Sequence, residues 1–143
     1  MRSLLVESLC ETFLEHSENI ALISNSHTVD YGTFDRLSTE SAIVLVEKCS
    51  GGNGVIGVYV DRSVEAIIAV MAILKAGLVY VPLDPLHPWE RTKYIIEDAD
   101  IGHIIGSEMS GVKTECFDKG GLWYGHSIVA LRLYEVALVY GAL

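Results

Sequence analysis

Residues 74–85, which read Leu-Lys-Ala-Gly-Leu-Val-Tyr-Val-Pro-Leu-Asp-Pro, decide the fold because they join a helix end to a strand. Lys75 lies where a cation meets the negative end of a helix dipole, and Gly77 suits the left-handed position just after a helix. Residues 78–83 form an almost unbroken apolar run, typical of a strand covered on both faces. Two prolines then prevent a regular ladder or a further helix. The stretch predicts a helix, a glycine stop and a buried strand.

Hydrophobic spacing before this stretch predicts a helix, a hairpin and a second helix. Apolar residues recur with helical spacing from about 4 to 16, and residues 20–23 and 28–31 are expected to form two strands of a hairpin. Thr33 is expected to cap a helix that runs to about Lys48. The apolar side of this helix consists of Phe34, Leu37, Ala42, Leu45 and Val46.

Strands and helices continue to alternate to residue 105. A strand is predicted at 55–60, a helix capped by Ser63 follows it, and a further helix near 89–98 leads to a strand at 101–105. The helix after Ser63 is expected to bury Ile67, Ile68, Met71 and Leu74. This alternation predicts an α/β fold, with a mainly parallel sheet and helices on both of its faces.

Composition and charge exclude several classes of protein. The chain has 143 residues, enough for one domain with a real core, and a formal net charge of −9. That charge argues against binding nucleic acid or an anionic membrane through a basic face, and the scattered acidic residues suit solubility. The apolar stretches 64–83 and 128–143 are both interrupted by charges, so no membrane-spanning helix is expected.

The cysteines indicate a reducing compartment. Cys10, Cys49 and Cys116 are odd in number and form no Cys-x-x-Cys pair, which suits free thiols in the cytoplasm. Cys10 is interpreted as a small buried hydrophobe. Near the N-terminus, Glu7 and Glu11 interrupt the apolar residues before a secretory signal can form.

Several patterns resemble binding or catalytic motifs but lack the context these motifs require. Residues 52–57 satisfy Gly-x-Gly-x-x-Gly, yet a helix precedes them and a strand follows, so they are interpreted as a turn. Residues 106–111 are interpreted as a loop, because Glu108 would oppose a phosphate and no lysine completes the motif. The histidines lie too far apart for a metal site; they are His16, His27, His87, His103 and His126. His87 is expected in a structural turn, and His103 is expected in a buried strand as a hydrogen-bonded residue of the core or of the strand end.

Acidic residues at strand and helix ends leave two interpretations open. Asp61–Arg62 follows a strand, at the sheet edge where α/β ligand sites gather, and a helix-entry ion pair is the favoured alternative to a ligand site. The same holds for Asp84 after the next strand. Glu97, Asp98 and Asp100 cluster at a helix end and are expected to be exposed rather than catalytic.

Four ordered stretches resemble adenylate-forming (AMP-binding) enzymes, specifically the adenylation domains of nonribosomal peptide synthetases. They are Val29-Asp30-Tyr31-Gly32-Thr33-Phe34-Asp35, Val58-Tyr59-Val60-Asp61-Arg62-Ser63, residues 74–85, and His87-Pro88-Trp89-Glu90-Arg91 with the helix after it. The resemblance implies the N-terminal part of the large subdomain of such an enzyme. Residues 1–106 are assigned to this part, and residues 107–143 are interpreted as a loop plus an apolar segment without assignment.

The resemblance implies the activity of a whole enzyme that would use ATP and Mg²⁺. Such an enzyme condenses an amino acid with ATP to an aminoacyl adenylate and loads it onto a carrier-protein thiol. The Val81-Pro82-Leu83-Asp84-Pro85 sequence favours amino acids over fatty or aryl acids as substrates. No Thr-Ser-Gly-Ser-Thr-Gly run or later motif is present, so no residue is predicted to be catalytic, cofactor-binding or metal-ligating.

The chain is accordingly expected to be a truncated, inactive adenylation domain with an open apolar sheet edge and marginal stability. Its expected partners are the remainder of a synthetase, or a protein that covers the apolar segment 128–140. The alternatives are a short binding protein on the same scaffold and a decayed gene product.

Overall fold

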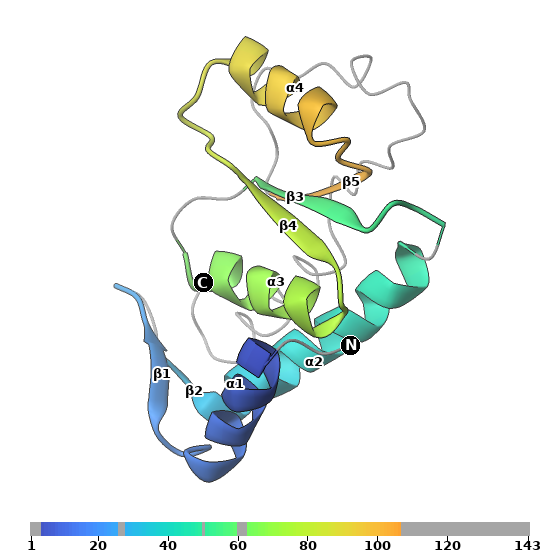
Figure 1. Cartoon of the computed structure of the whole chain (residues 1–143). Helices are drawn as coiled ribbons and strands as arrows, with labels where there is room; N and C mark the ends of the chain where they lie inside the picture. Colours follow the sequence, from blue (N-terminus) through green and yellow to red (C-terminus); the bar gives the residue numbers. More distant parts are fainter. Residues whose placement is uncertain (1–3, 26–27, 50, 60–62, 107–143) are drawn as a thin grey trace.

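The computed structural model in Figure 1 describes residues 4–25, 28–49, 51–59 and 63–106. Strands and helices alternate along these residues, which confirms the predicted α/β fold. The elements are α1 (Leu4–Glu15), β1 (Ile20–Ile23), β2 (Thr28–Asp30), α2 (Tyr31–Lys48), β3 (Val55–Tyr59), α3 (Val64–Lys75), β4 (Val79–Leu83), α4 (Trp89–Asp98) and β5 (His103–Gly106).

Three parallel strands form the central sheet of the described residues, in the order β4-β3-β5. Val55 pairs with Val79 and Ile56 with His103, so the carboxyl ends of the three strands lie side by side. The short strands β1 and β2 form a separate antiparallel pair, whose register shifts between Ile20 and Leu22. The expected parallel sheet and the expected hairpin pairing are both confirmed.

Helices lie on both faces of the sheet, as predicted (Figure 1). On one face, Ile56, Val58 and Ile105 join α3 in the main core. α2 packs against α3, and α1 and the β1–β2 pair pack against α2. On the opposite face, on the side of α4, Leu83 and Ile104 approach Gly57 of the central strand.

Strand β4 is less covered than its sequence predicts. Val79 and Tyr80 are 59% and 40% exposed, and only Leu83 is fully buried in this strand. The prediction of a strand covered on both faces is therefore wrong, because Val79 and Tyr80 are adjacent in the strand, point to opposite faces of the sheet and are both exposed. Val79 N–H donates to the Gly54 carbonyl, so the backbone N–H and carbonyl groups of every second residue from Val79 point toward β3. Pro82 lies between two such residues, so its nitrogen points away from β3. The hydrogen bonds between β4 and β3 therefore need no N–H group from Pro82.

Local hydrogen bonds explain where the helices begin and end. Ser63 Oγ accepts from Ala66 N–H at 3.1 Å, which confirms the predicted cap of α3. Gly77 has φ +72°, as predicted, and N–H groups of residues 77 and 78 return to the carbonyls of Leu74 and Ile73. The predicted Thr33 cap of α2 is wrong: Asp30 caps this helix, and its Oδ1 accepts from Thr33 N–H. Aspartate is at least as good a cap as threonine, and α2 therefore begins at Tyr31.

Helical spacing predicted most of the core but extended two apolar faces too far. Val46 of α2 is 53% exposed and Ile67 of α3 is 48% exposed, contrary to expectation. Each lies beside a residue that is buried, Leu45 and Ile68, so the buried stripe is narrower than the apolar one. Single exposed apolar side chains are ordinary on protein surfaces.

Two serines are buried in α2, and their hydroxyl groups differ in hydrogen bonding. Ser38 Oγ donates to the Phe34 carbonyl at 2.7 Å, whereas Ser41 Oγ has no hydrogen-bond partner in the part of the chain that the structure describes. Replacing Ser41 with alanine is expected to raise the free energy of unfolding by about 1 kcal/mol, because a buried unpaired hydroxyl is removed. Urea titration would measure this, with Ser38→Ala as the control that should bring no gain. A lower midpoint for Ser41→Ala would contradict the prediction.

Candidate functional site

The carboxyl ends of β3 and β4 meet at one edge of the sheet, the usual place for ligands in parallel α/β proteins. At this edge the Asp84 carboxylate accepts from Leu86 N–H at 2.8 Å, and the Asp84 carbonyl accepts from His87 N–H at 3.1 Å. His87 Nε2 lies 3.9 Å from the same carboxylate. Asp84 thus shapes the turn between β4 and α4, and its contact with His87 fits the favoured interpretation of a local ion pair once His87 is protonated. Asp61 and Arg62 lie outside the described residues.

At the amino ends of β3 and β5, an amide side chain joins the two loops that lead into these strands. Asn53 Nδ2 donates to the carbonyl and the carboxylate of Asp100, at 2.5 and 3.0 Å, and Asn53 Oδ1 accepts from Val55 N–H. Gly102 N–H donates to the Val55 carbonyl. These bonds join the loop before β3 to the loop before β5. Residues 52–54 of the Gly-x-Gly-x-x-Gly stretch form the turn between α2 and β3, with Gly54 at φ +77°, whereas residues 55–57 already belong to β3, so the interpretation as a turn holds for the first half of the stretch.

The remaining candidates of the sequence do not come together. Glu97, Asp98 and Asp100 are exposed, as expected. His87 lies in the turn after Asp84, as expected, and His103 is the first residue of β5 and half-buried, which matches the expected strand-end position. Within the described ranges, no group of three histidine, cysteine or acidic residues could hold a metal ion. His27, His126, Cys116 and residues 107–111 lie outside those ranges.

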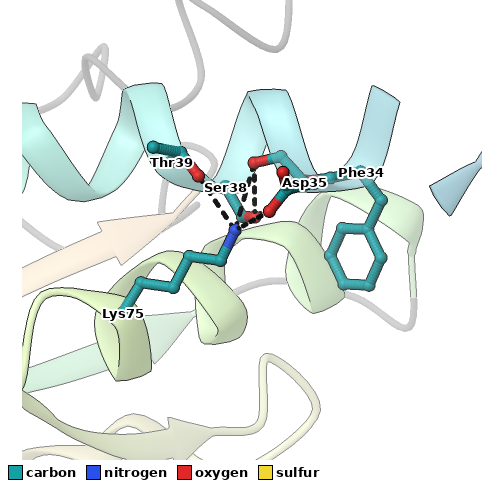
Figure 2. A network of polar contacts seen from close by, with 5 residues as sticks. All are labelled: Phe34, Asp35, Ser38, Thr39 and Lys75. Carbon is teal, nitrogen blue, oxygen red and sulfur yellow. Dashed lines mark hydrogen bonds and ion pairs between the residues drawn. The ribbon is translucent and has the colours of Figure 1, made fainter. Parts of the chain in front are cut away.

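Among the described residues, one enclosed charged group contacts three helices. Lys75, at the end of α3, has a side chain that is only 8% exposed. Figure 2 shows its ammonium reaching the first turns of α2, where it donates to Asp35 Oδ1 at 2.5 Å, to the Asp35 carbonyl at 3.1 Å and to Thr39 Oγ1 at 2.9 Å. The Phe13 ring of α1 lies 5.0 Å from the same nitrogen. We call Asp35, Thr39 and Lys75 the Lys75 cluster.

The geometry of the Lys75 cluster is that of a structural joint. An ammonium group has three N–H donors, and each has an acceptor here, so none is left for a substrate. The sequence placed Lys75 correctly in a last helical turn but gave no indication of Asp35, which is 40 residues away. A helix-dipole argument considers only the lysine's own helix, whereas the contact depends on how α2 packs against α3.

The described thiols differ in environment. Cys49 directly follows α2 and is 5% exposed, and burial raises its pKa above the ordinary value of 9.0. Cys10 was expected to be buried; it is half-buried and packs at the margin of the core. Neither forms a disulfide.

The raised pKa of Cys49 predicts a loss of stability in alkali. Below pH 9 both the folded and the unfolded chain keep the thiol proton, so this contribution is fully present. Above pH 9 the unfolded chain loses the proton first, and the free energy of unfolding falls until the folded pKa is passed. Urea titrations at pH 8 and pH 10 should show a larger fall for the natural chain than for Cys49→Ala. Equal falls in the two proteins would contradict the assignment.

Comparison with known proteins shows the family of the chain. The profile of the family described as "AMP-binding enzyme" matches residues 11–122. The chain belongs to the AMP-binding enzyme family. It is 37% identical to one component of the linear gramicidin synthase of Brevibacillus parabrevis over 68% of its length, and 35% identical to bacitracin synthase 3 of Bacillus licheniformis over 79%. It spans only about 2% of each of these synthase chains.

Solved structures with the same fold include adenylation domains. The chain matches the N-terminal subdomain of Klebsiella oxytoca NpsA with a TM-score of 0.71 and 20% identity, over 78% of this chain and 29% of the other. It also matches the nonribosomal peptide synthetase FmoA3 with a TM-score of 0.72 and 23% identity, over 85% of this chain and 14% of the other. The resemblance to the N-terminal part of a nonribosomal peptide synthetase adenylation domain is thereby confirmed. None of the helices in the described ranges is both long and apolar enough to span a membrane.

Proposed function

We propose that this chain is a scaffold region of an amino-acid-adenylating domain of a nonribosomal peptide synthetase. The whole enzyme would join an amino acid to ATP, form an aminoacyl adenylate and transfer the aminoacyl group to a carrier-protein thiol in the cytoplasm. The observation that carries the proposal is the 37% identity to a linear gramicidin synthase over 98 residues. The Val81-Pro82-Leu83-Asp84-Pro85 sequence at the end of β4 supports an amino acid as the substrate class.

The 143 residues alone are proposed to be catalytically inactive. Adenylate formation depends on groups aimed at the ATP phosphates and at the reacting carboxylate. In the described part of the chain, the Lys75 ammonium and the Asp84 carboxylate already hold neighbouring elements together. We therefore propose that the residues that bind ATP and Mg²⁺ belong to other parts of the enzyme.

The remainder of a synthetase is the proposed partner of this region. Four large apolar side chains at and after β4 are 40% to 90% exposed: Val79, Tyr80, Leu86 and Tyr94. Contact with further parts of the same enzyme would remove this surface from water, which is favourable. A carrier-protein domain is the proposed acceptor of the activated amino acid.

One purification tests both parts of the proposal. The native polypeptide that carries this sequence would be isolated with an antibody, sized, and assayed for amino-acid-dependent exchange of pyrophosphate into ATP. We expect a mass well above 15.6 kDa and measurable exchange, whereas the isolated 143 residues should give only background with every amino acid. A native polypeptide without exchange would refute the synthetase assignment. Exchange by the isolated chain would refute its inactivity.

A further inference from the structure

Helix α1 is attached to the rest of the fold through few side chains. Of its twelve residues only Val6 and Phe13 are buried, whereas Leu4, Leu5 and Leu14 are at least 60% exposed. It packs against α2 and follows the outside of the helical layer (Figure 1). A helix with so small a buried surface depends on the quality of its few anchoring contacts.

Phe13 is the main residue that holds α1 in place, and its ring contacts both aromatic rings of α2 and the charged ammonium of Lys75. Its ring is 1% exposed and lies edge-on to the ring of Phe34, with 5.1 Å between the centroids. The ring of Tyr31 is 5.9 Å away. The Lys75 ammonium lies 5.0 Å from the Phe13 ring centroid, a distance typical of cation–π attraction. The three helices therefore meet at a single nitrogen atom.

This arrangement makes the ring and the ammonium depend on each other. The three N–H groups of Lys75 point to acceptors on α2, while the Phe13 ring helps to keep the ammonium out of water. Cation–π attraction is strongest when the cation is desolvated. If α1 left its place, water would reach Lys75; if Lys75 lost its charge, α1 would lose part of its anchor.

We propose that α1 is a strap that opens separately from the rest of the fold and is held closed by the contact between Phe13 and the Lys75 cluster. In its open state the sheet, α2 and α3 stay folded, while α1 detaches and Lys75 becomes exposed. The device lies in α1, α2 and α3, away from the carboxyl edge of the sheet, and does not depend on the proposed activity.

The first test measures whether loss of the Phe13 ring makes the Lys75 amine more reactive. The natural chain and Phe13→Leu would be treated briefly with an amine-acylating reagent, and the modified lysines would be located by peptide mass spectrometry. We expect Lys75 to react about tenfold faster in Phe13→Leu, in line with a cation–π contribution of moderate size. Lys93, whose side chain is 53% exposed, is the internal control and should react at the same rate in both proteins. An unchanged Lys75 rate would overturn the proposal.

The second test measures whether loss of the Lys75 ammonium speeds amide hydrogen exchange in α1, whose own sequence is left unaltered. Lys75→Met is expected to speed exchange in residues 4–15 about tenfold more than Asp35→Ala does, because both variants lose the ion pair between α3 and α2 but only Lys75→Met removes the ammonium beside the Phe13 ring. The matched control is Lys93→Met on α4, which should leave α1 unaffected. Equal acceleration in all elements, or none in α1, would show that α1 does not open separately.

Discussion

Asp35→Ala is expected to lower the free energy of unfolding by about 2 kcal/mol. Breaking a buried ion pair by removing one partner costs about 3–5 kcal/mol, because the remaining charge is enclosed without compensation. Two facts reduce this figure here: the Asp35 side chain is 37% exposed, and alanine favours a helix more than aspartate does. The Asp35 carbonyl and Thr39 Oγ1 also continue to accept from Lys75. Urea or thermal unfolding followed by circular dichroism would measure the loss.

The matched control for Asp35 lies one turn along the same helix. Arg36 and Glu40 form an exposed pair at 3.4 Å, and Glu40→Ala should change stability by less than about 0.5 kcal/mol. Asp35→Asn keeps an acceptor oxygen without the charge, so its loss should fall between those two values. If Asp35→Ala costs no more than Glu40→Ala, the Lys75 cluster does not hold α2 to α3.

Gly57→Val is expected to be the most damaging single change in the sheet, with a loss of about 3 kcal/mol. A Cβ atom at this central position would lie 2.9 Å from Leu83 Cδ1 and 3.2 Å from both Ile101 Cγ2 and Ile104 Cγ1. The Leu83 methyl group can turn aside, but valine adds two further methyl groups in the same space. Overpacking of this kind costs about 1–3 kcal/mol, and occasionally more. Chemical denaturation would measure the loss.

Two variants separate overpacking from a general effect of losing glycine. Gly51→Ala places a Cβ where no heavy atom lies within 4 Å, so it should change stability by less than about 0.5 kcal/mol. Leu83→Ala opens space beside Gly57, and the cost of Gly57→Val should be smaller in that background than in the natural chain. Strictly additive losses would contradict the close approach of Gly57 and Leu83.

The sequence predicted those features that depend on neighbours in the chain. Ser63 caps α3 and Gly77 ends it as expected, because both roles follow from the backbone within a few residues. The exposure of Val79 and Tyr80 was not predictable from the apolar run, since such a run does not tell how many strands and helices surround it. Asp30 both ends β2 and caps α2, so a strand pattern that includes Asp30 hides its second role and leaves Thr33 as the apparent cap.

In the candidate site too, contacts between neighbours in the sequence were predictable, whereas contacts between residues far apart in the sequence were not. The turn role of Asp84 depends on Leu86 and His87, two and three residues away, and the sequence favours an ion pair at the helix entry over a ligand site there. The Lys75 cluster depends on the packing of α2 against α3, and no pattern within either helix pairs Lys75 with Asp35. Family resemblance located the stretch around Lys75 without indicating what its lysine contacts.

Pro82 affects how this sheet meets other polypeptide chains. Along the side of β4 that faces away from β3, the nitrogen of Pro82 interrupts the row of hydrogen-bond donors. A foreign strand laid along that side would leave one of its carbonyl groups without a partner and would lose part of the binding free energy. Sheets with exposed apolar edges are otherwise prone to pair into aggregates during folding. One imino acid thus lets β4 keep its apolar side chains available for contacts while discouraging indiscriminate strand addition.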